Sequence, residues 1–138
     1  MTSTKLQPLL TWTPAIGVGN EELDGHHKHM VELVNQIYYT VNTKSSPETL
    51  SGIVTELLEY ANYHFGAEEA LFVDKNYPLE TEHIEDHLAF RERLSEIRDL
   101  VEVGAEGAST KLLDTLYLWW TNHITNFDIK YSPFVKQG

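Results

Sequence analysis

Four long segments of this sequence carry apolar side chains at intervals of three and four residues. The segments cover residues 23–41, 50–65, 84–101 and 112–127. This spacing is close to the 3.6-residue period of the α-helix, so each segment predicts an amphipathic helix with one apolar face. Four such faces are buried together most simply when the helices pack against one another. The sequence therefore predicts an all-α protein.

Proline and glycine separate the four segments and indicate where the helices begin and end. Ser46 and Pro47 suit an N-cap and a first helical position, Pro78 interrupts the pattern, and Gly104 and Gly107 end the third segment. We expect helices at about 21–44, 47–74, 79–103 and 109–130. Short connections favour antiparallel neighbours, which gives an up-down-up-down antiparallel four-helix bundle.

The two ends of the helical region carry further expectations. Residues 1–20 are rich in proline and glycine, and we expect an N-terminal loop that packs across the bundle and is anchored by Trp12. At the other end, Ser109 is expected to cap the last helix, which should end before Pro133. No linker or internal repeat is apparent, so residues 1–138 are expected to form a single domain.

The composition argues against several kinds of site and partner. A fraction of 41% apolar residues predicts a packed core. The formal charge of −11 disfavours binding to nucleic acid or to anionic membrane surfaces. The sequence contains no cysteine, which excludes thiolate metal sites, iron–sulfur clusters and disulfides. Its first residues resemble neither a signal peptide nor a membrane-spanning helix, so a cytoplasmic protein is expected.

Histidines occur on all four predicted helices. His83 and His87 are four residues apart, so both rings project from one helix face and can bind one metal ion. They do not form the HExxH motif of zinc proteases, because Ile84 follows the first histidine. His64 and Glu68 have the same spacing and pair an imidazole with a carboxylate that can bridge two ions. A single histidine on an apolar face is usually a core residue, but this joint placement predicts a metal site.

The last helix contains His123 and Asp128 as further candidate ligands, but their five-residue spacing does not place them on one face of an α-helix. Five residues turn an ideal α-helix through about 500°, so the two side chains should point about 140° apart. Periodicity alone would make Asp128 an exposed acid near a helix end. A local irregularity of the helix is needed to direct it inward.

Four short stretches resemble the hemerythrin and bacteriohemerythrin family. They lie within residues 12–131 and read LDGHHKHM, YANYHFGAEEALF, YPLETEHIEDHLAF and WWTNHITNFD. Each stretch is weak evidence alone, but the order and spacing of all four agree with the family. The resemblance implies a non-haem di-iron centre that binds dioxygen reversibly, for oxygen carriage, storage or delivery.

The same resemblance implies five terminal histidine ligands and two bridging carboxylates. One iron would be held by His83, His87 and His123. The other iron would be held by His27 and His64. The implied bridges are Glu68, Asp128 and an oxo or hydroxo group. The second iron then has one donor fewer, so dioxygen is expected to bind there, with azide and nitric oxide as alternative ligands.

Two residues depart from the family pattern. His27 ends a segment that usually reads I-D-x-Q-H and here reads LDGHH, so His26 replaces the usual glutamine. His26 can therefore compete with His27 as a ligand, whereas His29 is a spare histidine. Trp120 stands where an aliphatic residue usually lines the oxygen pocket, and its bulk can narrow that pocket. Trp119 shares the same helix face, and we expect both tryptophans at the oxygen pocket.

Three other functions compete with oxygen carriage. An oxygen or redox sensor that acts through a separate partner protein fits the same site, and carriage is favoured because no signalling domain is recognisable in the sequence. A ferritin-like oxygenase is disfavoured, because only Glu80 and His83 form the Glu-x-x-His pair that such enzymes use on two helices. The protein is therefore not expected to be an enzyme. A structural bundle with histidines in its core is the last alternative, and metal analysis would test it.

Overall fold

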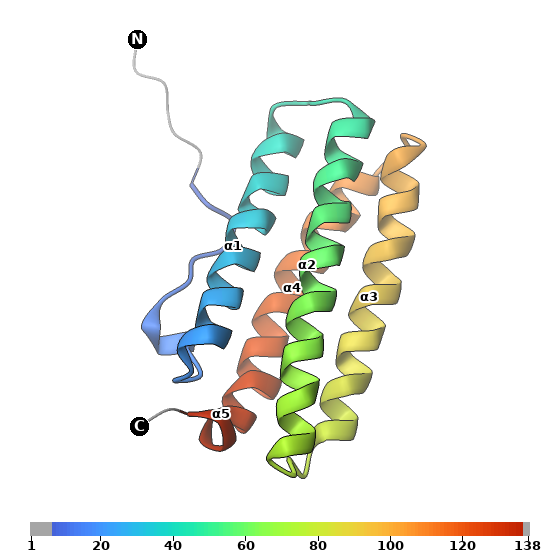
Figure 1. Ribbon diagram of the computed structural model, residues 1–138. Coiled ribbons are helices and arrows are strands. Elements are labelled where there is room, and N and C mark those ends of the chain that lie inside the picture. The colour runs from blue at the N-terminus through green and yellow to red at the C-terminus, as the bar shows by residue number, and fades with distance from the viewer. Residues whose placement is uncertain (1–6, 137–138) are drawn as a thin grey trace.

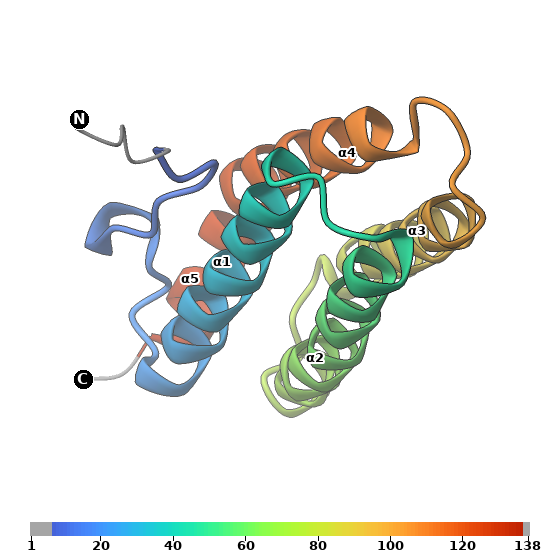
Figure 2. The same ribbon diagram turned by 90° about the horizontal axis from the view of Figure 1, so that it is seen from above.

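Four long helices run side by side in the computed structural model, which describes residues 7–136 (Figure 1). They are α1 (Glu21–Asn42), α2 (Pro47–Asp74), α3 (Glu80–Glu102) and α4 (Ala108–His123). In the bundle α2 contacts α1 and α3, while α4 contacts α3 and α1, so the four helices enclose a common core (Figure 2). The described residues contain no strand. The predicted all-α four-helix bundle is confirmed.

Side-chain caps mark the starts of α1 and α2. The side chain of Asn20 accepts a hydrogen bond from a backbone N–H in the first turn of α1, and Ser46 does the same for α2. Each such cap stabilises a helix by about 1 kcal/mol. Gly107 precedes α4 with a φ of 78°, a left-handed conformation that suits glycine. This turn starts α4 one residue earlier than expected, so Ser109 lies inside the helix and its predicted role as the cap is wrong.

The fourth predicted helix is divided and continues beyond its expected end. After α4 come a π-helical turn (Ile124–Asp128) and the short helix α5 (Ile129–Val135). The prediction that this helix ends before Pro133 is therefore wrong. Pro133 removes one backbone donor, but Tyr131 and Val135 of α5 are buried. Their packing offsets the lost hydrogen bond, because the stability of a short helix comes mainly from tertiary contacts.

A layer of polar side chains divides the apolar core into two clusters. The larger cluster contains fully buried residues from all four helices, including Ile37, Leu57, Leu94 and Leu112. The smaller cluster lies near α5 and contains Val18, Leu23, Phe72, Tyr77, Tyr131 and Val135. Phe65 of the larger cluster stacks on His87, while Phe72 of the smaller cluster contacts His83. The buried histidines therefore lie between the two clusters.

The N-terminal segment runs alongside the bundle next to α1 (Figure 1). The backbone N–H and C=O of Leu10 both bond the side-chain amide of Asn35, each at 2.9 Å. Trp12 packs against the larger cluster from outside, and the Nζ atom of Lys28 lies 4.4 Å from the centre of its ring. Leu10 and Trp12 thus both hold this segment. Residues 1–6 of the predicted loop 1–20 lie outside the described range.

Within residues 7–136, none of the helices combines the length and the apolar composition needed to cross a membrane.

Candidate metal site

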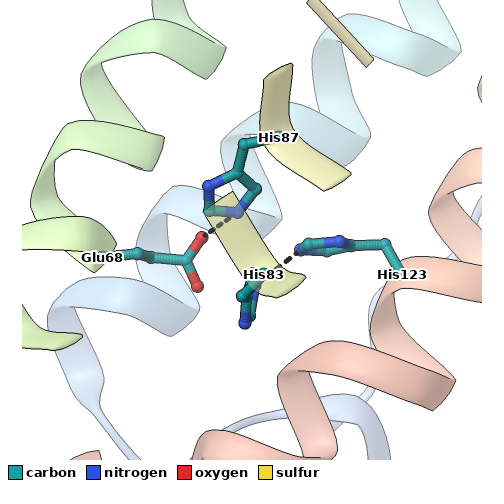
Figure 3. Close-up of side chains that lie close together, drawn as sticks. All are labelled: Glu68, His83, His87 and His123. Atoms are coloured by element: carbon teal, nitrogen blue, oxygen red, sulfur yellow. Dashed lines mark hydrogen bonds and ion pairs between the residues drawn. The ribbon is translucent and has the colours of Figure 1, made fainter. Parts of the chain in front are cut away.

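Seven side chains meet in the polar layer at the centre of the bundle. They are the seven predicted metal ligands: His27, His64, Glu68, His83, His87, His123 and Asp128. All are buried, with exposed fractions between 0% and 2%. Figure 3 shows four of them pointing toward one another from α2, α3 and α4. Burial of so many polar groups is costly unless they are paired or bind an ion, so apolar packing alone does not account for this cluster.

The histidines form two groups that share one carboxylate. In the first group, ligand atoms of His83, His87, His123 and Glu68 all lie within 4.8 Å of one another. In the second group, ligand atoms of His27, His64 and Glu68 satisfy the same limit. Each group is compact enough to surround one ion. The site is therefore asymmetric, with three histidines on one side and two on the other.

The two carboxylates lie between the histidine groups. Asp128 Oδ1 is 2.8 Å from His123 Nε2, and its Oδ2 is 3.1 Å from His27 Nε2. The two oxygens of Asp128 thus face opposite groups. Glu68 Oε1 lies 3.0 Å from His64 Nε2 and 3.3 Å from His87 Nε2. Each carboxylate therefore contacts histidines of both groups.

The π-helical turn explains how Asp128 reaches the site. A π-helix forms hydrogen bonds between residues five apart, so its turn contains more residues than an α-helical turn. The turn spans Ile124–Asp128, directly after His123. It brings Asp128 onto the face of His123, although an ideal α-helix would point the two side chains in different directions. The helix irregularity that the sequence required is confirmed.

Several buried polar atoms of the site have no hydrogen-bond partner among the described residues. They include Nε2 of His27, His64 and His87, Oε1 of Glu68 and both carboxylate oxygens of Asp128. These atoms lie close to one another but are not aligned as hydrogen bonds. Unpaired buried polar atoms are rare in native structures and call for an explanation such as an ion. Imidazole and carboxylate donors suit iron, zinc and other transition metals, so the donor set fits metal binding.

Charges within the metal-free site shift several pKa values. Burial lowers the pKa of His123, but the charge of Asp128 outweighs burial and raises it to about 10. Burial also lowers the pKa of His27, but the effect of Asp128 is larger than that of burial, so this pKa is raised as well. Burial raises the pKa of Asp128, but His123 and His27 together bring it well below its ordinary value. Burial lowers the pKa of His87 to about 4. Without metal, Asp128 is therefore ionised, and its charge favours the protonated forms of His123 and His27.

Asp86 and Tyr131 support the site, and neither was among the residues predicted from the sequence. Asp86 Oδ2 lies 2.6 Å from His123 Nδ1, which turns Nε2 of that ring toward the cluster. The hydroxyl of Tyr131 donates a hydrogen bond to Oε2 of Glu68. Both residues follow a predicted ligand by three positions, Asp86 after His83 and Tyr131 after Asp128. Residues three apart lie on the same helix face, so this spacing was the sequence signal that could have identified both residues.

The two tryptophans lie on different sides of the site. Trp119 stacks on His123 at 4.4 Å between ring centres and donates a hydrogen bond from Nε1 to Asp86. Trp120 contacts His27 edge-to-face at 5.8 Å. Only Trp120 is therefore next to the two-histidine group, where the resemblance places the oxygen pocket.

His26 and His29, the two histidines outside the implied ligand set, also differ in their surroundings. His26 is buried and forms a hydrogen bond with His64. His29 is partly exposed, packs on Tyr60 and lies 3.5 Å from Glu32. His26 points toward the outer nitrogen of His64, while His27 faces the cluster.

A four-helix bundle around a buried cluster of histidines and carboxylates defines a class of metal-binding bundle proteins. Comparison with known families identifies the particular member of this class. Residues 18–135 match the family described as the Hemerythrin HHE cation binding domain. The chain belongs to the hemerythrin family.

Individual relatives agree with this assignment. The chain is 31% identical over 129 residues to the bacteriohemerythrin of Pseudomonas aeruginosa strain PAO1, an alignment that covers 94% of this chain and 83% of the relative. It is 29% identical to the bacteriohemerythrin of Stenotrophomonas maltophilia, covering 93% of this chain and 82% of the relative. A hemerythrin-like protein of Naegleria gruberi is also 29% identical, with coverage of 94% and 97%. The similarity therefore extends over nearly the whole chain.

Proposed function

We propose that this protein binds two iron ions in the central site and uses them to bind dioxygen reversibly, for carriage, storage or delivery. The observation that carries the proposal is the unequal division of the histidines between two groups that share bridging carboxylates. Three histidines would hold one ion: His83, His87 and His123. The other ion would be held by His27 and His64. Glu68 and Asp128 would contact both ions.

Counting the protein donors indicates where dioxygen would bind. Three histidines and two carboxylates would supply five donors to one ion, whereas the ion at His27 and His64 would receive only four. The second ion is therefore the one with room for an external ligand. When bound, two ferrous ions supply the electrons that dioxygen accepts. Azide and nitric oxide, which are small and bind iron, are expected to use the same position.

Aromatic side chains pack against the three-histidine group, and all seven proposed ligands are at most 2% exposed, so the site is shielded from water. Phe65 stacks on His87 with 3.8 Å between ring centres. Trp119 and Phe127 both stack on His123. A dry site strengthens the electrostatic contacts inside it and limits the access of solvent protons. These conditions favour reversible ligand binding over irreversible oxidation of the metal.

Optical spectroscopy tests the proposed function. Protein that is reduced anaerobically and loaded with ferrous iron should develop a visible charge-transfer band in air. The band should disappear under vacuum and return with air over several cycles. Irreversible oxidation in the first cycle would contradict carriage and favour the sensor function, which needs a separate partner protein. Protein that holds no iron would contradict both.

Trp120 is the residue expected to control access to this position. It is 5% exposed and lines a pocket of about 260 Å³ together with Leu9, Leu10 and Ile16 of the N-terminal segment. Trp120→Leu should lower the free energy of unfolding by about 2–3 kcal/mol, because it leaves a cavity. The wider passage should also speed azide binding to the ferric protein and autoxidation of the oxygenated protein. Stopped-flow absorption measures both rates.

Trp119→Leu is the matched control for this experiment. It removes the same indole on the side of His123, where no external ligand is expected. Its unfolding free energy should also fall, while its azide association rate should stay near that of the wild type. If Trp120→Leu loses stability but keeps wild-type rates, Trp120 contributes only to packing.

A further inference from the structure

His26 makes a buried contact with the back of a proposed iron ligand. Its Nδ1 lies 2.9 Å from Nδ1 of His64, and the two rings meet at nearly a right angle. The side chain of His26 is almost fully buried. On its other side, Nε2 of His26 lies 3.9 Å from Oε1 of Glu22, an exposed residue one helical turn earlier. His26 therefore connects His64 with the surface of α1.

The distance between the two rings sets the positions of their protons. Two ring nitrogens 2.9 Å apart can share only one hydrogen. When His64 binds an ion through Nε2, the nitrogen that faces Glu68, its own proton must be on Nδ1. His64 then donates the hydrogen bond, and Nδ1 of His26 accepts it. The proton of His26 is consequently on Nε2, the atom nearest to Glu22.

We propose that His26 is a positioning residue for the ion held by His27 and His64, an inference that rests on the proposed function. By accepting the hydrogen bond from Nδ1, His26 holds the ring of His64 in one tautomer and one orientation. Partners of this kind increase the basicity of a metal-bound imidazole and its affinity for the metal.

The two sides of the site differ in the chemistry of this support. Asp86, a carboxylate, accepts from His123 on the three-histidine side. On the two-histidine side, His26, an uncharged imidazole, accepts the corresponding hydrogen bond from His64. A neutral acceptor polarises the ligand less than a carboxylate does. The weaker support is on the side where the proposed external ligand binds, so a loss of His26 should affect that ion selectively.

A matched pair of variants tests this role. His26→Asn keeps an acceptor oxygen at the same bond position as Nδ1, and His26→Leu has a similar size and shape without an acceptor. Ferrous protein would be challenged anaerobically with an iron chelator, and the iron retained per chain would be measured. His26→Leu should bind one of its two ions roughly 10–100-fold more weakly. His26→Asn should remain within a few-fold of the wild type, as should His29→Leu, which alters a partly exposed histidine on the same helix.

The melting temperature of each metal-free variant separates positioning from packing. The asparagine and leucine variants should melt at similar temperatures while they differ in iron affinity. Should leucine prevent folding, the unbranched His26→Met offers the same comparison. Wild-type affinity in the leucine or methionine variant would overturn the proposal, and so would equal losses in the asparagine and leucine variants. A wild-type protein that binds fewer than two irons would instead contradict the proposed function on which the inference rests.

Discussion

Replacing His83 by alanine is expected to remove most of the iron from the protein. His83 is fully buried, and its Nε2 lies 3.3 Å from Oδ1 of Asp128 and 3.3 Å from Nε2 of His123. Alanine takes a donor from the three-histidine group and leaves no side chain that can replace it. The expected loss of affinity exceeds the roughly 10–100-fold that accompanies removal of an outer partner of a ligand. Iron analysis of the purified protein measures it directly, with two irons per chain expected in the wild type.

His29→Ala is the control for this substitution. His29 is a partly exposed histidine of α1 whose contacts are Tyr60 and Glu32, away from the cluster. Its removal should leave the iron content unchanged. Helix content measured by circular dichroism should be the same in both variants. Iron loss in His29→Ala, or one iron per chain in the wild type, would refute the ligand assignment.

Acid is expected to release the iron, because protons and metal compete for the same nitrogen atoms. In the metal-free protein the pKa of His123 is raised to about 10, and that of His27 is raised as well. His123 is therefore protonated at neutral pH and must lose a proton to bind iron, and the raised pKa of His27 favours the protonated form of that ring as well. The affinity for iron should rise with pH up to about 10 and fall as the solution becomes acidic.

The other ligands affect this competition differently. The pKa of His87 is lowered by burial to about 4, so this ring stays neutral until the solution is strongly acidic. Burial raises the pKa of Glu68, but His64 brings it well below its ordinary value. The pKa of Asp128 is also well below its ordinary value. The carboxylates therefore remain ionised through the range in which iron leaves. Addition of ferrous iron to weakly buffered metal-free protein at pH 7 should release protons, and a titration without proton release would contradict the assignment.

Loss of iron should also lower the melting temperature. A ligand present at about 1,000 times its dissociation constant stabilises the folded state by about 4 kcal/mol. In the metal-free protein, ion pairs between the histidines and carboxylates of the site stabilise the fold in part. The raised pKa of His123 stabilises the metal-free fold fully below the unfolded value of 6.5, and this contribution is lost as the pH rises through about 10. The lowered pKa of Asp128 stabilises it above the unfolded value of 3.8, and this contribution is lost in stronger acid.

Calorimetry of the iron-loaded and metal-free proteins checks these signs. The difference between their melting temperatures should be large at neutral pH and should shrink toward acid as the iron leaves. Equal melting temperatures at pH 7 would show that the cluster gains no stability from metal.

The amino-acid sequence by itself determined the helices and most of the predicted ligand positions. Apolar residues at intervals of three and four predict amphipathic helices, because such residues share one helix face. The same geometry places His83 with His87, and His64 with Glu68, since residues four apart project from one face. Both patterns are local, and they survive in the structure because the tertiary packing agrees with them.

Only the tertiary structure decided the features that depend on contacts between distant segments. Asp128 reaches the cluster through a π-helical turn, which α-helical periodicity does not predict. Asp86 meets His123 across two helices, and His26 meets His64 across two others, so spacing along one helix does not reveal which ligand either residue contacts. Pro133 predicts a helix end, yet burial of neighbouring residues in α5 outweighs that local signal. In each case the free energy of long-range packing and hydrogen bonding exceeds the preference of the local sequence.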